Sequence, residues 1–243
     1  MKTKILSKMR RNIHQFNSRS INPIVVLALF ILITWTSRFY YFTQFGIYED
    51  DHYRVPVAMA WNWSEFWQFL SLLPSNLIQM NGQGRMLHPS LIQTFSFLGE
   101  QLGGLSAIYL FGFCIVATNT ILFYYLLKRL YNQPIFVIAG TLTFALFPAD
   151  TTQAFLTHAL GVQPALMLLL IAFHLYISKR RSFTFLSYLC IFTSLFIYEK
   201  FFLVFLAAPL LKQSPKSLKR ELIQHSMLLS GAFIAVAIAR RLQ

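Results

Sequence analysis

The sequence predicts an all-α fold, a polytopic bundle of about seven transmembrane helices. Hydrophobic residues make up 56% of the 243 residues and charged residues only 12%, about half the share in soluble domains. The charges stand between the apolar runs. These runs are continuous and do not alternate with polar residues, which indicates membrane helices and argues against a barrel. We expect one module over residues 23–243.

The basic residues indicate how the chain is oriented. The net charge is +13, and 15 of the 21 Lys and Arg residues fall in four clusters beside apolar runs. The clusters are Lys2, Lys4, Lys8, Arg10, Arg11 and Arg19; Lys128 and Arg129; Lys179, Arg180 and Arg181; and Lys212, Lys216, Lys219 and Arg220. This positive-inside pattern predicts a multi-pass membrane protein with a cytoplasmic basic tail at residues 1–22, and we expect it in a bacterial plasma membrane. It argues against a nucleic-acid partner.

Three runs are long enough to span a bilayer: 24–42, 105–127 and 155–177. The first follows the basic tail and has no small-residue cleavage site after it, which predicts an uncleaved signal-anchor. Run 134–148 has only 15 residues, but a crossing is required there if the clusters on either side are both cytoplasmic.

The last two runs follow from the same rule. Residues 183–211 are apolar except for Glu199 and Lys200 in the middle. A hairpin turning at Tyr198-Glu199-Lys200 keeps the flanking clusters on one side, so we prefer it to a single long helix. Run 227–239 then leads outward to Arg240 and Arg241, which depart from the charge rule.

The longest stretch without a span is the outer loop 46–104, where we expect two interfacial helices. Residues 57–73 carry five aromatic side chains among polar ones. The second helix begins at Pro89 and places four apolar side chains on one face. Those four are Leu91, Phe95, Leu98 and Leu102.

On this topology, seven of the eight acidic residues lie on the outer side, which suggests that the chemistry takes place there. The outer acids are Glu49, Asp50, Asp51, Glu65, Glu100, Asp150 and Glu199. The triplet Glu49-Asp50-Asp51 directly follows the first span. Adjacent carboxylates of this kind suit a general base or a metal-binding cluster; the alternative is a solvated loop.

Cations that could meet an anion lie further along. A glycine turn brings Arg85 and His88 to the start of the second interfacial helix. A helix N-terminus favours anions, and Arg binds phosphate through two hydrogen bonds. The alternative is an ordinary capped connection. Asp150 suits either a helix cap or a site for an acceptor or metal, and Glu199 with Lys200 suits an ion pair at the hairpin tip. For His158 and His174 we expect packing within helices.

The order of these features resembles the N-terminal module of GT-C membrane glycosyltransferases, in particular the protein O-mannosyltransferases and lipid A aminoarabinose transferases. In that family an acidic pair followed by an aromatic comes after the first span, and Glu49-Asp50-Asp51-His52-Tyr53 is similar. His88-Pro89-Ser90 is similar to the family's His-Pro-Pro turn, with Ser90 in place of the second proline. Pro148-Ala149-Asp150 is similar to its second acidic site.

The resemblance implies transfer of a sugar from a polyprenyl-phosphate donor to an acceptor hydroxyl outside the membrane. It implies a catalytic pair from Glu49, Asp50 and Asp51, with both registers open. Donor phosphate would be bound by Arg85, His88, Lys200 and Arg240, and the acceptor or a divalent cation (Mg²⁺ or Mn²⁺) by Asp150. Family members are about twice as long, so we expect a truncated or split form, with a second membrane subunit as a partner beside membrane lipid.

Two other classes of protein fit the sequence less well. A transporter or flippase would place ionisable groups at mid-membrane, whereas the acidic residues here cluster at the outer ends of the runs. A noncatalytic assembly partner fits the short chain.

Overall fold

The fold is entirely helical in the part of the chain that the structure describes. A computed structural model describes residues 22–79, 85, 87–147, 155–178, 180–211 and 218–241, and within these ranges it contains no strand. The predicted fold class is therefore confirmed.

The bundle is built from α2 (Pro23–Thr34), α6 (Leu105–Leu130), α7 (Pro134–Ala145), α8 (Gln163–Tyr176), α9 (Arg181–Leu195), α10 (Lys200–Val204) and α11 (Leu218–Arg241). Two π-helical turns adjoin these helices: η1 (Trp35–Phe39) continues α2, and η4 (Thr157–Val162) leads into α8. Three 3₁₀ segments complete the set: η2 (Phe42–Gln44), η3 (Glu49–Tyr53) and η5 (Phe205–Leu211). The loop between α2 and α6 holds α3 (Val55–Met59), α4 (Trp63–Gln79) and α5 (Leu87–Gly103).

Four helices are long and apolar enough to cross a membrane: Pro23–Gln44, Leu105–Leu130, Thr157–Tyr176 and Leu218–Ile238. The predicted count of about seven crossings is not supported on these grounds. Helix α7 has 12 residues and α9 has 15, while α10 has five and η5, which follows it, has seven. All fall below the ~20 residues that a perpendicular crossing needs.

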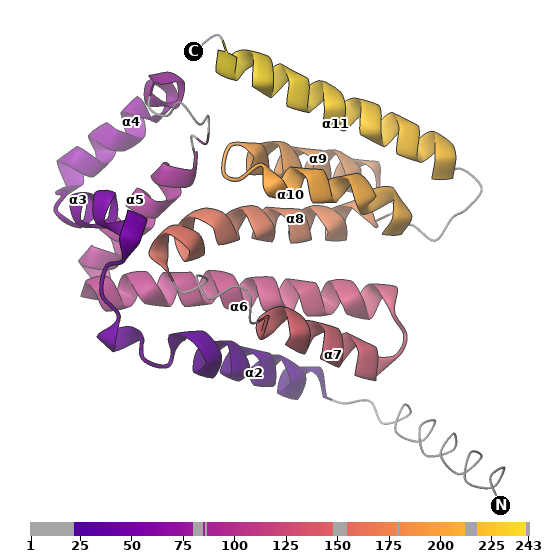
Figure 1. The fold of residues 1–243 in the computed structure, drawn as a ribbon, viewed down its shortest axis with the longest axis horizontal. Helices are drawn as coiled ribbons and strands as arrows, with labels where there is room; N and C mark the ends of the chain where they lie inside the picture. The colour runs from indigo at the N-terminus through magenta and orange to yellow at the C-terminus, as the bar shows by residue number, and fades with distance from the viewer. Residues whose placement is uncertain are drawn as a thin grey trace, which may run out of the picture.

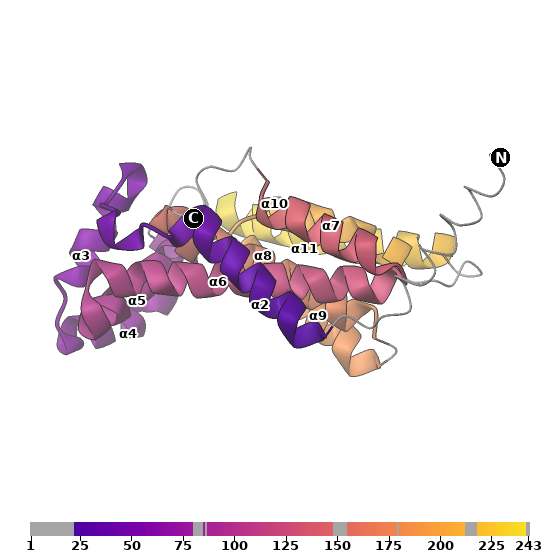
Figure 2. The same ribbon diagram turned by 90° about the horizontal axis from the view of Figure 1, so that it is seen from below.

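The basic clusters that the structure describes lie together at one end of the bundle. Figures 1 and 2 show the C-terminal end of α6 and the N-terminal ends of α2, α9 and α11 together at one end of the bundle, and α3, α4 and α5 at the other. Lys128 and Arg129 lie in the last turn of α6, Arg181 begins α9, and Lys219 lies in the first turn of α11. We call these the basic end and the loop end. That the basic end faces the cytoplasm stays a prediction.

The predicted hairpin is confirmed. Helix α9 ends at Leu195, and the chain turns through Tyr198 before α10 begins at Lys200. Figure 1 shows α10 running back beside α9.

Helix α11 is longer than the apolar run 227–239, because it begins at Leu218. Its first turns are polar, but buried His225 holds them against the bundle. The Nε2 atom of His225 lies 2.9 Å from the Phe205 carbonyl oxygen, and its Nδ1 atom lies 2.7 Å from the Tyr188 hydroxyl. His225 thus ties the first part of α11 to η5 and to α9.

The first interfacial helix is two helices instead of one. Helix α3 ends at Met59 and α4 begins at Trp63. Asn62 and Glu65 form a capping box between them: the Asn62 amide donates to Glu65 Oε2 at 2.8 Å, and the Glu65 amide donates to Asn62 Oδ1 at 3.0 Å. Side-chain capping therefore begins a new helix inside the expected one.

The second interfacial helix forms as expected, but the face that it buries in the protein is not the predicted apolar stripe. Leu102 is 72% exposed, whereas Ile92, Ser96 and Phe97 are fully buried. The reason is that α5 packs against α6, α3 and η4 and also against α4, where Phe66 stacks on Phe97 with ring centroids 4.2 Å apart. Packing on several sides shifts the buried face away from the simple 3.6-residue stripe.

Close contacts fix η4 and α8 against α6. An added Cβ at Gly112 would lie 2.9 Å from that of Ala159, so the two backbones approach as closely as glycine allows. The Asn119 amide group donates to the backbone oxygen and to the side-chain oxygen of Gln163, at 3.0 and 2.8 Å, and both side chains are buried. The residues of η4 therefore have a fixed position at the loop end.

Candidate functional site

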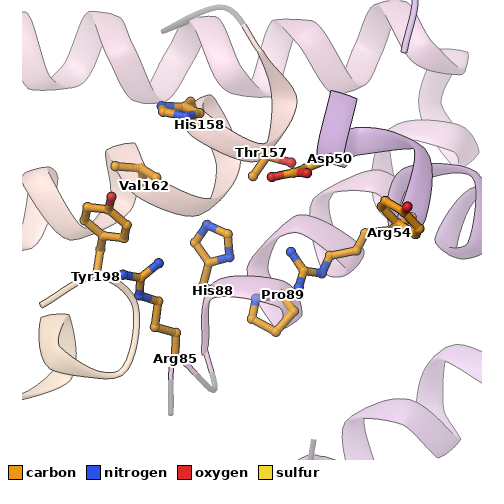
Figure 3. Close-up of a pocket in the computed structure, with 10 residues that line it drawn as sticks. Asp50, Arg54, Arg85, His88, Pro89, Thr157, His158, Val162 and Tyr198 are labelled. Carbon is orange, nitrogen blue, oxygen red and sulfur yellow. The ribbon is translucent and has the colours of Figure 1, made fainter. Parts of the chain in front are cut away.

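A polar cavity of about 550 Å³ opens at the loop end of the bundle. Its lining comes from η3 and the residue after it, from the start of α5, from η4 and from the α9–α10 turn (Figure 3). The lining residues are Asp50, Tyr53, Arg54, Arg85, His88, Pro89, Thr157, His158, Val162 and Tyr198. The cavity thus brings together three of the segments singled out in the sequence.

The acidic triplet separates into residues with different surroundings. It forms the 3₁₀ segment η3, in which residues three apart lie on one side. Asp50 and Tyr53 therefore share the side that lines the cavity. Glu49 is exposed and is not part of the lining. Its backbone has φ of 43°, an uncommon left-handed conformation for a residue other than glycine.

Asp51 points away from the cavity into the protein and is 1% exposed. Its Oδ1 accepts hydrogen bonds from the Thr157 amide at 2.6 Å and from the Thr157 hydroxyl at 2.5 Å, and its Oδ2 accepts from the Leu156 amide at 3.1 Å. These amides belong to the first turn of the η4–α8 helix, whose N-terminus favours a negative charge. Asp51 is thus a helix cap supplied from a distant part of the chain.

Arg85 is held by the hairpin tip. Its Nε and Nη2 donate to the two carboxylate oxygens of Glu199 at 2.9 and 2.6 Å. These hydrogen bonds raise the pKa of Arg85 above its ordinary value. The guanidinium also lies over the Tyr198 ring, 4.5 Å from its centroid. The expected ion pair within the hairpin tip is therefore replaced by a pair between the tip and Arg85.

A backbone hydrogen bond also joins the start of α5 to the α9–α10 hairpin. The Leu87 amide at the start of α5 donates to the Phe196 carbonyl at the end of α9, at 2.9 Å. The start of α5 and the α9–α10 turn together form one wall of the cavity.

His88 is buried in the cavity wall, with an exposed fraction of 8%. Burial lowers its pKa to about 4, with further lowering by the charges of Arg54 and Arg85. The imidazole is therefore neutral at pH 7 and can act as a hydrogen-bond partner, which differs from the cationic role expected from the sequence. Gly161 makes room for it, because a Cβ there would lie 2.6 Å from Nε2.

The sequence analysis gave no role in the site to three further lining residues, Arg54, Thr157 and His158. Arg54 follows η3 directly and brings a second guanidinium to the cavity. His158 lines the cavity instead of having the purely packing role that we expected. Thr157 and His158 belong to the π-helical turn η4; such turns are frequent at functional sites, but no residue pattern announced this one.

The other predicted site residues lie elsewhere. Lys200 is exposed, with its ammonium 5.3 Å from the Tyr198 ring centroid, and does not line the cavity. Arg240 is in the last turn of α11, but its side chain is outside the described part of the structure, as is the whole of Asp150. Among the residues that the structure describes, no group of three or more His, Cys, Asp and Glu could hold a metal ion.

No protein-family model, curated protein or solved structure matches this chain.

Proposed function

We propose that this chain is a membrane glycosyltransferase module that transfers a sugar from a polyprenyl-phosphate donor to an acceptor hydroxyl at the outer membrane surface. One observation carries the proposal: a single polar cavity at the loop end holds the Asp50 carboxylate together with the guanidinium groups of Arg54 and Arg85 (Figure 3). A base and phosphate-binding cations are the two groups that this reaction requires.

In the proposed reaction, Asp50 takes the proton of the acceptor hydroxyl as its oxygen attacks the anomeric carbon of the sugar. The bond between that carbon and the phosphate oxygen breaks, and its electron pair leaves with the lipid phosphate. General-base assistance of this kind contributes roughly 10²–10⁴-fold in rate. Asp50 suits the role because it is exposed to the cavity, whereas Asp51 is used in capping η4.

The leaving phosphate gains negative charge, and we assign its binding chiefly to Arg54. No carboxylate pairs with the Arg54 side chain among the described residues, whereas Arg85 is already bound by Glu199 through two hydrogen bonds. An Arg has five N–H donors, so Arg85 can still offer some of them to the phosphate while Glu199 fixes its position. Neutral His88 would add a hydrogen bond.

The donor's lipid tail must stay in the bilayer while its phosphate reaches the cavity. We therefore propose that the loop end lies at the outer headgroup level, and that α7, α9 and α10–η5 also cross the membrane, which makes seven crossings with the four longer helices. Shorter helices are tolerated where the bilayer thins locally or flanking residues snorkel. On this proposal the chain works with a second membrane subunit.

The decisive experiment measures transfer in membranes containing the protein and a panel of radiolabelled polyprenyl-phosphate sugars. Asp50→Asn should lower the rate at least 100-fold without loss of membrane insertion. Glu49→Gln removes a carboxylate one residue earlier, outside the cavity, and should keep most of the rate. Equal rates for the parent and Asp50→Asn would refute the assignment of the base.

A binding measurement separates the residues that bind the donor phosphate from the residue that acts as the base. Arg54→Gln should weaken the binding of an unlabelled polyprenyl phosphate about tenfold or more, since a charged hydrogen bond contributes about 1.5–3 kcal/mol. Asp50→Asn should leave this binding intact or strengthen it. If the parent binds no polyprenyl phosphate, the substrate class is wrong, and if it moves the lipid across the bilayer without transferring sugar, the flippase alternative is correct.

A further inference from the structure

A second cavity, of about 520 Å³, lies at the basic end of the bundle. Leu122, Tyr125, Lys128 and Arg129 of α6 line it together with His174 of α8. Two hydrogen bonds between the helices fix its walls: Arg129 Nη1 donates to the His174 carbonyl at 2.9 Å, and His174 Nε2 lies 2.9 Å from the Leu122 carbonyl oxygen.

No carboxylate among the described residues pairs with the two cations of this cavity. The one ion pair among the described residues joins Arg85 to Glu199, at the other end of the bundle. Arg129 contacts a neutral carbonyl, and the Lys128 ammonium lies 5.8 Å from the centroid of the Tyr124 ring. Both side chains are exposed. They can therefore meet an anion without first breaking an ion pair.

An exposed stripe leads from the cavity along α6 toward the loop end. It consists of Leu110, Cys114, Thr118 and Tyr125, all exposed, at helical spacings of four, four and seven. The Thr118 hydroxyl donates to the Cys114 carbonyl at 2.7 Å, so its hydrogen bond is satisfied within the helix and Thr118 does not add an unpaired donor to the stripe. The cavity and the stripe thus combine two cations with a long apolar track, which is the shape of a phospholipid and not that of a free anion.

We infer that this cavity binds an anionic phospholipid, with the phosphodiester held by Lys128 and Arg129 and an acyl chain lying along the α6 stripe. Basic pockets between helices on the cytoplasmic side of membrane proteins suit such headgroups. The Tyr125 side chain, 38% exposed, lies where aromatic residues are enriched at the membrane boundary. The inference rests on the basic end lying at a membrane surface and is independent of sugar transfer.

The test is to titrate dioleoylphosphatidylglycerol and dioleoylphosphatidylcholine into the detergent-purified full chain and to count bound lipids by native mass spectrometry. We expect tighter binding of the anionic lipid, weakened roughly fivefold by Lys128→Gln and about 25-fold by Lys128→Gln with Arg129→Gln. The matched control is Lys219→Gln with Arg220→Gln, which removes the same charge at the same end outside the cavity and should keep the parental affinity.

Three results would overturn the inference. The two double variants could lose affinity equally, which would mean general charge attraction, or the zwitterionic lipid could bind as tightly as the anionic one. Millimolar inorganic phosphate could displace the lipid fully, which would mean a site for free anions. The single variant Lys128→Gln keeps the Arg129 contact with α8, so it reports on binding even if the double variant is poorly folded. No transfer activity is measured, so failure here leaves the proposed function untouched.

Discussion

Replacing Asp51 with alanine should destabilise the protein, whereas replacing Asp50 should not. Asp51→Ala leaves three donors without their partner: the amides of Leu156 and Thr157 and the Thr157 hydroxyl. Asp51 is 1% exposed, and Leu156 is fully buried beside it. Unpaired buried donors cost about 1–3 kcal/mol each, and losing a helix cap costs about 0.5–2 kcal/mol. Since water can reach the half-buried Thr157, we expect a total of about 3–5 kcal/mol.

Thermal unfolding of the detergent-solubilised protein measures this difference. A loss of about 3–5 kcal/mol should lower Tm by roughly 6–20 °C in a chain of this size. Asp51→Asn keeps one acceptor oxygen and should lose about half as much. Asp50→Asn should keep the parental Tm while losing transfer. If Asp51→Ala unfolds at the parental temperature, or Asp50→Asn unfolds as early as Asp51→Ala, the separation of the two carboxylates into a cap and a base is wrong.

Three further variants test the packing of the fold, the first two by thermal unfolding and the third by limited proteolysis. Gly161→Ala should lower Tm, because the new Cβ would lie 2.6 Å from Nε2 of His88, and overpacking costs about 1–3 kcal/mol; an unchanged Tm would mean that α5 shifts freely. Burial lowers the pKa of His88 to about 4 from an ordinary 6.5, so between these pH values the unfolded chain binds more protons than the folded chain. Stability should therefore be fully present above pH 6.5 and fall by up to about 3 kcal/mol toward pH 4, a dependence that His88→Asn should reduce. His225→Phe removes the hydrogen-bond partner that α11 gives to the Phe205 carbonyl and the Tyr188 hydroxyl, at a cost of about 1–3 kcal/mol, and should make α11 more susceptible to protease; parental resistance would refute that anchor.

Charge and hydropathy predicted the helices better than the details of their ends. The position of each apolar run and the hairpin near Tyr198 followed from the pattern of Lys and Arg clusters, because membrane insertion depends on that pattern. The break at Asn62 was missed since a capping box depends on two polar side chains that look like ordinary surface residues. The polar start of α11 was missed for a related reason: its docking residue, His225, is buried by contacts with distant segments.

The candidate site could be predicted in part. Asp50, Arg85 and His88 line one cavity, and each was singled out from local sequence. Arg54 and Thr157 were not singled out. Their place in the lining depends on the 3₁₀ segment η3 and the π-helical turn η4, whose geometry is set by packing across the bundle. The partner of Glu199 was wrong for the same reason, since Arg85 lies 114 residues away in the chain.

The acidic residues that the sequence places on the predicted outer side have structural roles in three cases. Asp51 caps η4, Glu65 caps α4, and Glu199 fixes Arg85. Each satisfies backbone amides or a cation at the loop end, where helix N-termini and the hairpin tip gather. Among the described residues of the cavity lining, this leaves Asp50 as the one carboxylate. One is sufficient for the proposed reaction, because a phosphate departs as an anion held by guanidinium groups and needs no second carboxyl group to protonate it.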